Sequence, residues 1–244
     1  MSKLQPPKNE SDPRWGADNR DIKALSIFQA VSGITGLIMS KTVWLDIGCG
    51  SGGITYSIAP KVKSITGIDP ESWVRWDTFQ NNHDNLVFLN ESVESLSCKD
   101  NSIDVVICNQ VYEHVPDPIQ LIHEIHRVLK PGGICYFAGP NLLFPIEPHV
   151  FWPFVHWLPR NIAVKIMKLF GSKKILDAYS ADYWTLKRWL SAFEIKNALP
   201  YILKNPCQFS HNGIIWNAIS YFPEKLITSL SFLSPSFIFL IEKK

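Results

Sequence analysis

The sequence predicts an α/β fold, in which a doubly wound, mostly parallel sheet carries a helical, aromatic-rich insertion after its fifth strand. Three observations predict it. From residue 41 to residue 139, short apolar runs alternate with segments whose apolar residues recur at helical spacing. Four glycines fall within six residues directly after the first apolar run. Aromatic residues and prolines then accumulate over residues 142–182.

The composition indicates a cytoplasmic protein with one sizeable domain. Of the 244 residues, 46% are hydrophobic, so the chain can bury a large core. The five cysteines are scattered without a C-x-x-C pair, which is typical of a reducing compartment. Residues 1–20 are polar and proline-containing, so we expect a flexible tail without the apolar core of a signal peptide. Residues 21–244 are then the folded domain.

The first part of the chain predicts alternating helices and strands. Apolar residues recur at helical spacing over 21–39, and we expect this helix to pack across the sheet edge and to cover a ligand. The remaining segments up to the fifth strand are strand 43–47, a helix from Ile54, strand 64–69, helix 71–82, strands 86–89 and 102–109, helix 119–130 and strand 134–139. Pro131, Gly132 and Gly133 are expected to end the last of these helices, with glycine in a left-handed cap.

The last part of the chain predicts further helices and two closing strands. These are helix 184–193, strand 194–199, helix 216–233 and strand 237–241. The longest apolar run without charge, residues 226–241, carries four serines and Pro235 and is short for a membrane span. We therefore expect a helix followed by a buried strand there, with a membrane anchor as the alternative.

The glycine-rich turn after the first strand predicts a ligand site. Glycines let the backbone turn tightly and approach a ligand, and the helix that follows offers free N–H groups. Gly48, Gly50 and Gly53 fit the dinucleotide pattern G-x-G-x-x-G. Asp46 argues against a dinucleotide, because a carboxylate at the strand end would repel a pyrophosphate. It suits a ligand with an ammonium or sulfonium group, and S-adenosylmethionine carries both.

Asp69 predicts a contact with a ribose. It ends the second strand 19 residues after Gly50, close to the spacing at which an acidic residue binds ribose hydroxyls. The alternative is a helix N-cap, because Pro70 and Glu71 follow and aspartate caps helices well. The two roles do not exclude one another.

Several ordered motifs together resemble the Rossmann-like, class I S-adenosylmethionine-dependent methyltransferases that act on small molecules. Residues 45–52, Leu-Asp-Ile-Gly-Cys-Gly-Ser-Gly, look like the first motif of this family. Glu113-His114 after the fourth strand and the Leu-Lys-Pro-Gly-Gly turn at 129–133 resemble later motifs. The resemblance covers about residues 41–139. It implies a methyltransferase fold, methyl transfer as the activity and S-adenosylmethionine as the cofactor.

The resemblance also assigns cofactor contacts. In the family an acidic residue after the third strand commonly reads the adenine amino group, with the next residue packed on the ring. Here Ser92 holds that position beside Val93, and Glu94 is the candidate for the missing carboxylate. Asn109 and Gln110 follow the fourth strand and are expected near the methionine end. The full set of expected cofactor-binding residues is Asp46, Gly48, Cys49, Gly50, Gly52, Asp69, Pro70, Ser92, Val93, Glu94, Asn109 and Gln110.

Transfer to an oxygen would need a base, and two histidines are candidates. His114 follows Glu113 near the active edge of the sheet, and His149 opens the insertion. We expect no metal site, because His123 and His126 have the wrong spacing for H-E-x-x-H. Asp104 begins the fourth strand at the opposite edge and is expected to be a structural hydrogen-bonding residue.

The segment after the fifth strand predicts a substrate-side lid over residues 140–182. Its aromatic faces suit sugars, rings or acyl chains, although packing of an added helical layer also explains them. Residues 160–174 form a basic amphipathic segment, which suits an anionic membrane surface, a phosphorylated substrate or plain solvent. We expect a small-molecule or glycan/lipid-linked acceptor and no nucleic acid, since no dense basic stripe appears at a net charge of +2. A non-catalytic S-adenosylmethionine-binding scaffold and an NAD(P)-dependent oxidoreductase are the alternatives.

Overall fold

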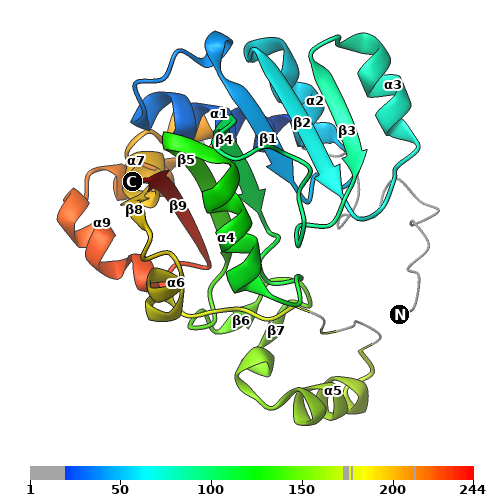
Figure 1. Ribbon diagram of the computed structural model, residues 1–244. Coiled ribbons are helices and arrows are strands. Elements are labelled where there is room, and N and C mark those ends of the chain that lie inside the picture. Colours follow the sequence, from blue (N-terminus) through cyan, green and yellow to red (C-terminus); the bar gives the residue numbers. More distant parts are fainter. Residues whose placement is uncertain (1–19, 173–175, 177, 212) are drawn as a thin grey trace.

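A seven-stranded sheet forms the centre of the protein (Figure 1). The computed structural model describes residues 20–172, 176, 178–211 and 213–244. Residues 1–19 of the expected tail and the basic residues Lys173 and Lys174 lie outside the described residues, whereas Arg20 begins the first helix. The strands are β1 (Val43–Ile47), β2 (Ser64–Asp69), β3 (Leu86–Asn90), β4 (Ile103–Asn109), β5 (Leu129–Pro140), β8 (Phe193–Asn197) and β9 (Ser236–Lys243).

The strand order is β3-β2-β1-β4-β5-β9-β8. The pairs from β3 to β5 are parallel, whereas β9 runs antiparallel to both β5 and β8. The predicted doubly wound, mostly parallel sheet is therefore confirmed. Because the chain starts at β1 and winds first to one side and then to the other, the carboxyl ends of β1 and β4 meet at the place where the winding reverses. Ligands bind at such a point in open α/β sheets.

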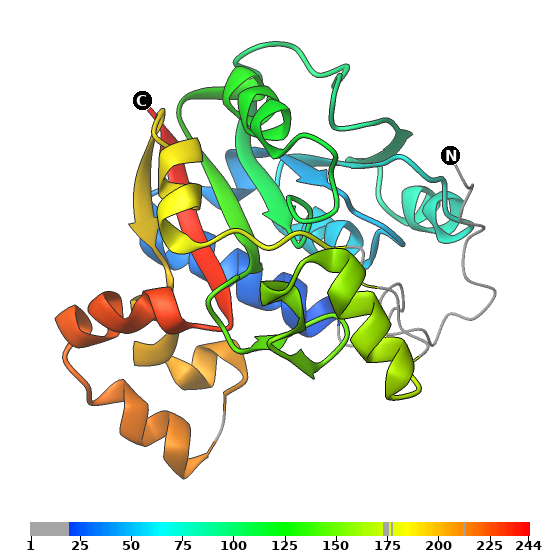
Figure 2. The ribbon, with the colours of Figure 1, turned by 90° about the horizontal axis from the view of Figure 1, so that it is seen from below.

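Helices cover both faces of the sheet, and alternate residues of each strand face opposite layers (Figure 2). Trp44 and Ile107 pack with the α1 and α2 side, whereas Leu45 and Val106 pack with the α4 and α6 side. The helices are α1 (Arg20–Ile34), α2 (Gly53–Ile58), α3 (Arg75–Asn82), α4 (Pro118–Val128), α6 (Tyr183–Trp189) and α7 (Leu199–Lys204). The continuous apolar pattern of the inner strands follows from burial on both faces.

Three expected helices differ from the structure. The first helix packs against a face of the sheet beside α2, not across its edge, because Ala24, Ile27 and Val31 share a buried cluster with Trp44. The third begins at Arg75, so Asp69 does not cap it. The expected helix 216–233 is two helices, α8 (Ile214–Ser220) and α9 (Glu224–Leu230), because Pro223 cannot continue a helix.

The glycine turn at 131–133 also differs from expectation. Helix α4 ends at Val128, and its C-cap residue Leu129 already has extended backbone and belongs to β5. Gly132 has φ +74°, but it lies within an irregular stretch of β5 where the register with β4 shifts. Gly132 therefore provides the positive φ that the irregular part of the strand requires, and it does not cap the helix.

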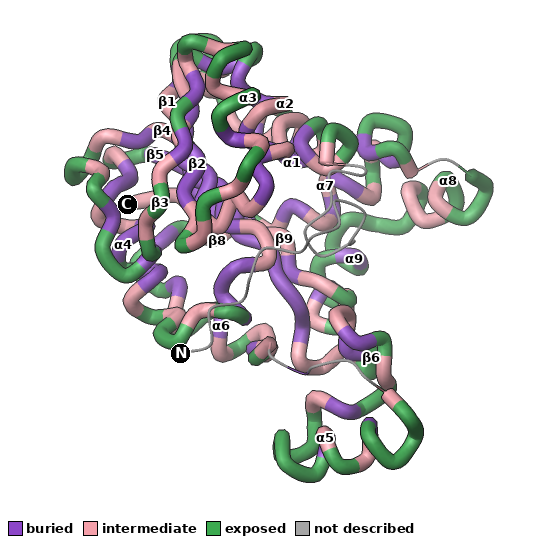
Figure 3. Tube along the Cα trace, turned by 90° about the vertical axis from the view of Figure 1, so that its right-hand side faces the viewer, coloured by how far each residue is buried: buried purple, intermediate pink, exposed green. Residues whose placement is uncertain are grey.

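The described residues between β5 and α6 form a separate layer beside the sheet (Figure 3), and residues 140–182 are referred to below as the insertion. It contains the hairpin strands β6 (Ile146–Glu147) and β7 (Trp152–Pro153) and the helix α5 (Arg160–Leu169). Val150, Val155, Ala163, Met167 and Leu176 form a buried cluster of its own. Among the described residues, no helix combines the length and the apolar character that crossing a membrane requires.

Candidate active site

The turn after β1 contains positions whose backbone conformation suits glycine and disfavours other residues. Gly48, Gly50 and Gly52 all have positive φ, the left-handed region that side chains disfavour. A Cβ on Gly48 would lie 2.7 Å from Val111, and one on Gly52 would lie 2.5 Å from Phe88. Trp76 closes the turn from α3, because its indole N–H donates to the carbonyl of Gly50 at 2.9 Å. The turn thus leaves a rigid cradle of backbone groups at the carboxyl end of β1.

Asp69 connects this turn to the end of β2. One carboxylate oxygen accepts from the backbone N–H of Gly50 at 2.9 Å, and the other accepts from Glu71 at 3.0 Å. Each oxygen has a further lone pair, so both can still accept from ribose hydroxyls. Burial raises the pKa of Asp69, while the two backbone hydrogen bonds oppose this rise. The carboxylate is therefore held in place before any ligand arrives.

Asp46 lies beneath the turn instead of on its surface. Its side chain is buried, and it accepts a hydrogen bond of 2.7 Å from the hydroxyl of Thr55 in α2. Burial raises the pKa of Asp46 to about 7, against the opposing effects of the Thr55 bond and of Arg20. A cationic ligand group above the turn would favour its ionised form.

The expected adenine-side residues lie after β3, and two of them are linked. The hydroxyl of Ser92 donates to the carboxylate of Glu94 at 3.0 Å, and both side chains are exposed. Val93 is buried in the core beside them. The carboxylate of Glu94 therefore lies beside Ser92, the residue expected to hold the adenine position.

Asn109 and Gln110 lie at the carboxyl end of β4. The Asn109 Oδ1 atom is buried and accepts no hydrogen bond from the described residues. Gln110 has φ +59°, a strained conformation for a residue with a side chain, and its N–H donates to Ala138 at 2.8 Å. Such strain is typical of functional sites, and it aims the chain from β4 toward Glu113.

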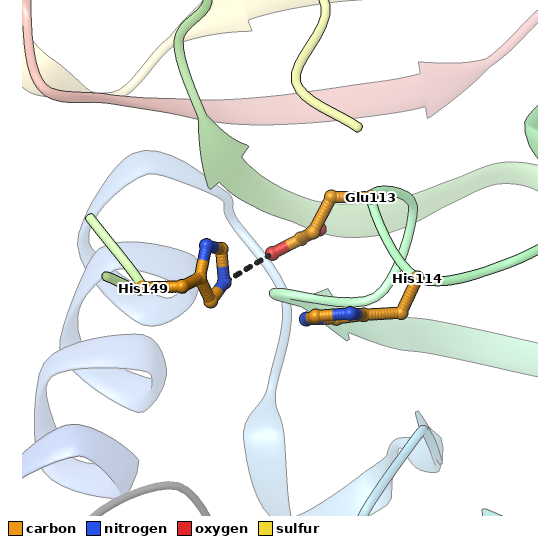
Figure 4. A group of neighbouring side chains, drawn as sticks. All are labelled: Glu113, His114 and His149. Atoms are coloured by element: carbon orange, nitrogen blue, oxygen red, sulfur yellow. Dashed lines mark ion pairs between the residues drawn. The ribbon is translucent and has the colours of Figure 1, made fainter. Parts of the chain in front are cut away.

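Glu113, His114 and His149 come together beyond the carboxyl ends of the strands (Figure 4). Glu113 is 0% exposed, and burial raises its pKa to about 7. The Nε2 atom of His149 lies 3.7 Å from a carboxylate oxygen of Glu113. The Nδ1 atom of His149 lies 2.7 Å from Glu147, and the rings of His114 and His149 meet edge to face at 5.1 Å.

The surroundings of Glu113 fix both its position and the insertion. Gly139 leaves room for Tyr112 and Glu113, since a Cβ there would clash with the Tyr112 ring and lie 3.3 Å from Glu113. The Tyr112 hydroxyl bonds to Pro140 and Ala181, and the Tyr179 N–H donates to the Glu113 carbonyl at 2.8 Å. Both ends of the insertion are therefore attached beside the buried carboxylate.

Most residues predicted from the sequence lie at the carboxyl edge of the sheet. Two acids of the site, Glu113 and Glu147, had no role predicted for them. Gly48, Cys49, Gly50 and Gly52 form the turn, and Pro70 follows Asp69 as an exposed residue. Glu113 was named only as part of a motif, and Glu147 was assigned no role. Their signal is the pairing of each acid with a nearby histidine in sequence. Asp104 is structural as expected, because it binds the Val43 N–H at 2.8 Å and Lys130 at 2.6 Å.

The chain resembles known methyltransferases in sequence and in fold. Residues 45–137 match a family model described as a methyltransferase domain. A ubiquinone biosynthesis O-methyltransferase of Serratia proteamaculans is 35% identical over 111 residues, which are 43% of this chain and 45% of that protein. The chain spans about half the length of the curated relatives it matches.

Solved structures show the same fold at low identity. A putative sarcosine dimethylglycine methyltransferase from Galdieria sulphuraria is 17% identical with a TM-score of 0.54, over 92% of this chain and 86% of that one. A geranyl diphosphate C-methyltransferase from Streptomyces coelicolor A3(2), solved with S-adenosylhomocysteine, is 16% identical with a TM-score of 0.54. The match covers 90% of this chain and 76% of that one. These two likenesses concern the fold of the chain.

Proposed function

We propose that the chain is a class I S-adenosylmethionine-dependent methyltransferase that transfers a methyl group to an oxygen of a small-molecule or glycan/lipid-linked acceptor. The observation that carries this proposal is the common location of three parts. The glycine turn, Asp69 and the Glu113–His149–Glu147 array all follow the carboxyl ends of neighbouring strands. The O-methyltransferase name of the curated relatives supports oxygen as the methylated atom.

The residues after β1, β2 and β3 fit the cofactor. The glycine turn suits a ligand because its left-handed residues Gly48, Gly50 and Gly52 carry no side chain, Asp69 suits the ribose, and the Ser92–Glu94 pair suits the adenine amino group. When bound, S-adenosylmethionine supplies a methyl group that is already activated on a sulfonium. The protein then has to orient the acceptor and remove its proton.

His149 is suited to take that proton. Its Nδ1 atom is held by Glu147, and Glu147 is held by the backbone N–H groups of His149 and Val150 at 2.7 and 2.6 Å. With Nδ1 donating, Nε2 carries the lone pair that a general base needs. His114 is exposed beside it and is the second candidate.

The insertion is suited to cover the acceptor and to approach a membrane. Ala163 and Met167 of α5 face the small core of the insertion. Leu169 and Phe170 are 81% and 73% exposed, so these apolar residues of the amphipathic segment do not join that core. The basic and apolar residues exposed on this layer include Phe151, Phe154, Trp157, Arg160, Ile162, Lys165 and Lys168. This combination fits an anionic bilayer that delivers a lipid-linked acceptor.

Cofactor binding tests the proposal first. Titration calorimetry with S-adenosylhomocysteine is expected to give micromolar binding, and NADH is expected not to bind. Asp69→Ala removes the ribose acceptor and should weaken S-adenosylhomocysteine binding by at least tenfold, an effect of about 1.4 kcal/mol or more. Asp77→Ala, an exposed carboxylate on α3, is the control. Binding of NADH alone would overturn the proposal in favour of an oxidoreductase.

Turnover distinguishes an enzyme from a scaffold. A screen of hydroxyl-bearing acceptors, read as S-adenosylhomocysteine formed, should find one that supports catalysis. A protein that binds the cofactor and methylates none of them would be a scaffold. Full turnover in both His114→Ala and His149→Ala would exclude the proposed base.

Membrane contact has its own test. The protein should float with vesicles that contain phosphatidylglycerol and should not float with vesicles of phosphatidylcholine alone. Lys165→Glu with Lys168→Glu should abolish flotation, whereas Lys61→Glu with Lys63→Glu, on the far side of the glycine turn, should not. Equal flotation of both double variants would contradict docking through α5.

A further inference from the structure

The cluster of Glu113, His114 and His149 has a property that proton removal does not need. Each side chain offers one ligand atom, and these three atoms lie within 4.8 Å of one another (Figure 4). Two of the residues follow β4, and the third comes from the insertion, far away in the sequence. Among the described residues, no other group of three histidine, cysteine or acidic side chains meets in this way.

Glu113 has a buried carboxylate that faces His149 at 3.7 Å without a hydrogen bond to it. It is 0% exposed, and neither of its oxygens accepts a hydrogen bond from another described residue. Burying a carboxyl group in this way is costly unless something compensates it. His114 and His149 each present a potential ligand atom to this carboxylate.

His149 presents a lone pair to this carboxylate. Since Glu147 accepts the Nδ1 proton at 2.7 Å, the neutral imidazole carries its lone pair on Nε2. Nε2 lies 3.7 Å from Glu113, which exceeds the roughly 2.8 Å of a charge-assisted hydrogen bond. In the neutral form of His149, the two atoms thus face one another at a distance longer than a hydrogen bond.

We propose that Glu113, His114 and His149 bind one divalent cation, with Glu147 orienting His149 from behind and the oxygen of the acceptor as a further ligand. The acceptor part of this inference rests on the proposed function. Metal–ligand bonds of about 2.1 Å place neighbouring ligand atoms roughly 3 to 4 Å apart. The His149 and Glu113 ligand atoms, 3.7 Å apart, already have this spacing. A small rotation of the exposed His114 ring would bring its ligand atom, now within 4.8 Å of the other two, to the same spacing.

The ligand types select the class of metal. Two imidazole nitrogens and one carboxylate oxygen suit zinc, cobalt or manganese better than magnesium, which prefers oxygen ligands. Three protein ligands leave coordination positions open, as in catalytic metal sites. The contact between Glu147 and Nδ1 of His149 is the carboxylate–histidine arrangement that commonly supports a metal-binding histidine.

A cation here would change the part that the histidines play. An acceptor hydroxyl that reaches the cation loses its proton more readily, so His114 and His149 act as ligands instead of bases. The oxygen–hydrogen bond breaks and the proton passes to solvent. The oxygen then forms its bond to the methyl carbon as the sulfur–carbon bond breaks, so charge and atoms balance.

Cobalt titration of the chelator-treated full chain tests the proposal. Co²⁺ should bind one equivalent and give visible absorption bands of a site with nitrogen and oxygen ligands, and Zn²⁺ should displace it. Glu113→Gln and His149→Ala should each weaken Co²⁺ binding by at least tenfold, and Glu147→Gln by about 10- to 100-fold. His123→Ala, an exposed histidine on α4, should bind Co²⁺ like the wild type.

The outcomes separate this inference from the proposed function. Circular dichroism and S-adenosylhomocysteine titration of each variant show whether it is folded, independently of cobalt. Loss of Co²⁺ binding with S-adenosylhomocysteine binding retained supports the site. Failure of the wild type to bind Co²⁺ at millimolar concentration, or equal binding by Glu113→Gln and His149→Ala, overturns it. Cobalt binding without any S-adenosylhomocysteine binding would leave the metal site standing and refute the methyltransferase proposal.

Discussion

Buried carboxylates dominate the candidate site at the scale of single residues. Asp46, Asp69 and Glu113 each have a raised pKa, and burial is the largest cause in every case. Such groups reduce the stability of the free protein and become favourable when a cationic or hydrogen-bonding ligand arrives. The site is thus arranged at a cost in stability that ligand binding offsets.

Asp46 predicts how stability depends on pH. Its pKa is about 7 in the folded protein and 3.8 when unperturbed, so between these values the folded state holds a proton that the unfolded chain has released. The free energy of unfolding should therefore fall as pH rises from about 4 to 7 and then level off. Asp46→Asn keeps an acceptor for Thr55 and removes this loss, a gain of up to about 4 kcal/mol above pH 7.

Urea unfolding of the ligand-free protein at pH 5 and pH 8 measures this difference. Asp77→Asn, on the exposed side of α3, is the control and should keep the wild-type dependence on pH. The same slope in Asp46→Asn as in the wild type would show that Asp46 is ionised throughout. S-adenosylhomocysteine should bind Asp46→Asn more weakly, because the charge opposite its ammonium group is lost.

At the scale of elements, the sequence predicts best where local patterns decide the structure. The strand at 64–69 has the expected bounds, and the turn at 48–53 follows from its glycines. The predicted end of α4 was wrong, because the conformation of Gly132 is decided by the register between β4 and β5 and not by a helix cap. Helix α3 starts at Arg75 instead of Glu71 because the Asp69 carboxylate accepts from the N–H groups of Gly50 and Glu71 and does not cap a helix.

Contacts between distant segments could not be predicted in this way. His149 meets Glu113 because the insertion is attached beside Tyr112 at Pro140, Tyr179 and Ala181. No local periodicity encodes such an attachment. The sequence therefore predicted His114 and His149 as separate candidates, while their common location and the role of Glu147 required the structure. The inward face of α5 was missed for the same reason, since Val150 and Val155 supply the other half of its packing.

At the scale of the whole molecule, the insertion has a core separate from the sheet. Met167 is buried with Val150, Val155 and Ala163, whereas Ile107 is buried between the sheet and α1. Segments with small cores of their own often open independently of the rest of a protein. The insertion should therefore be able to move without unfolding of the sheet.

Two substitutions that shorten a buried side chain, one in each core, test whether the insertion opens independently of the sheet. Met167→Ala should speed hydrogen exchange within residues 146–169 and leave exchange in β1 and β4 unchanged. Ile107→Ala should lower the free energy of unfolding of the whole protein by about 2 to 5 kcal/mol and speed exchange everywhere. Faster exchange of β1 and β4 in Met167→Ala would show that the two cores unfold together.

The position of β9 makes one edge of the sheet depend on a contact between distant parts of the chain. Among the described strands, β8 pairs only with β9, and β9 links it to β5. β8 precedes β9 in the chain, but it reaches the rest of the sheet only through β9. Whichever pair forms first, this edge of the sheet is complete only when β9 has paired with the distant strand β5, a contact whose large sequence separation slows folding.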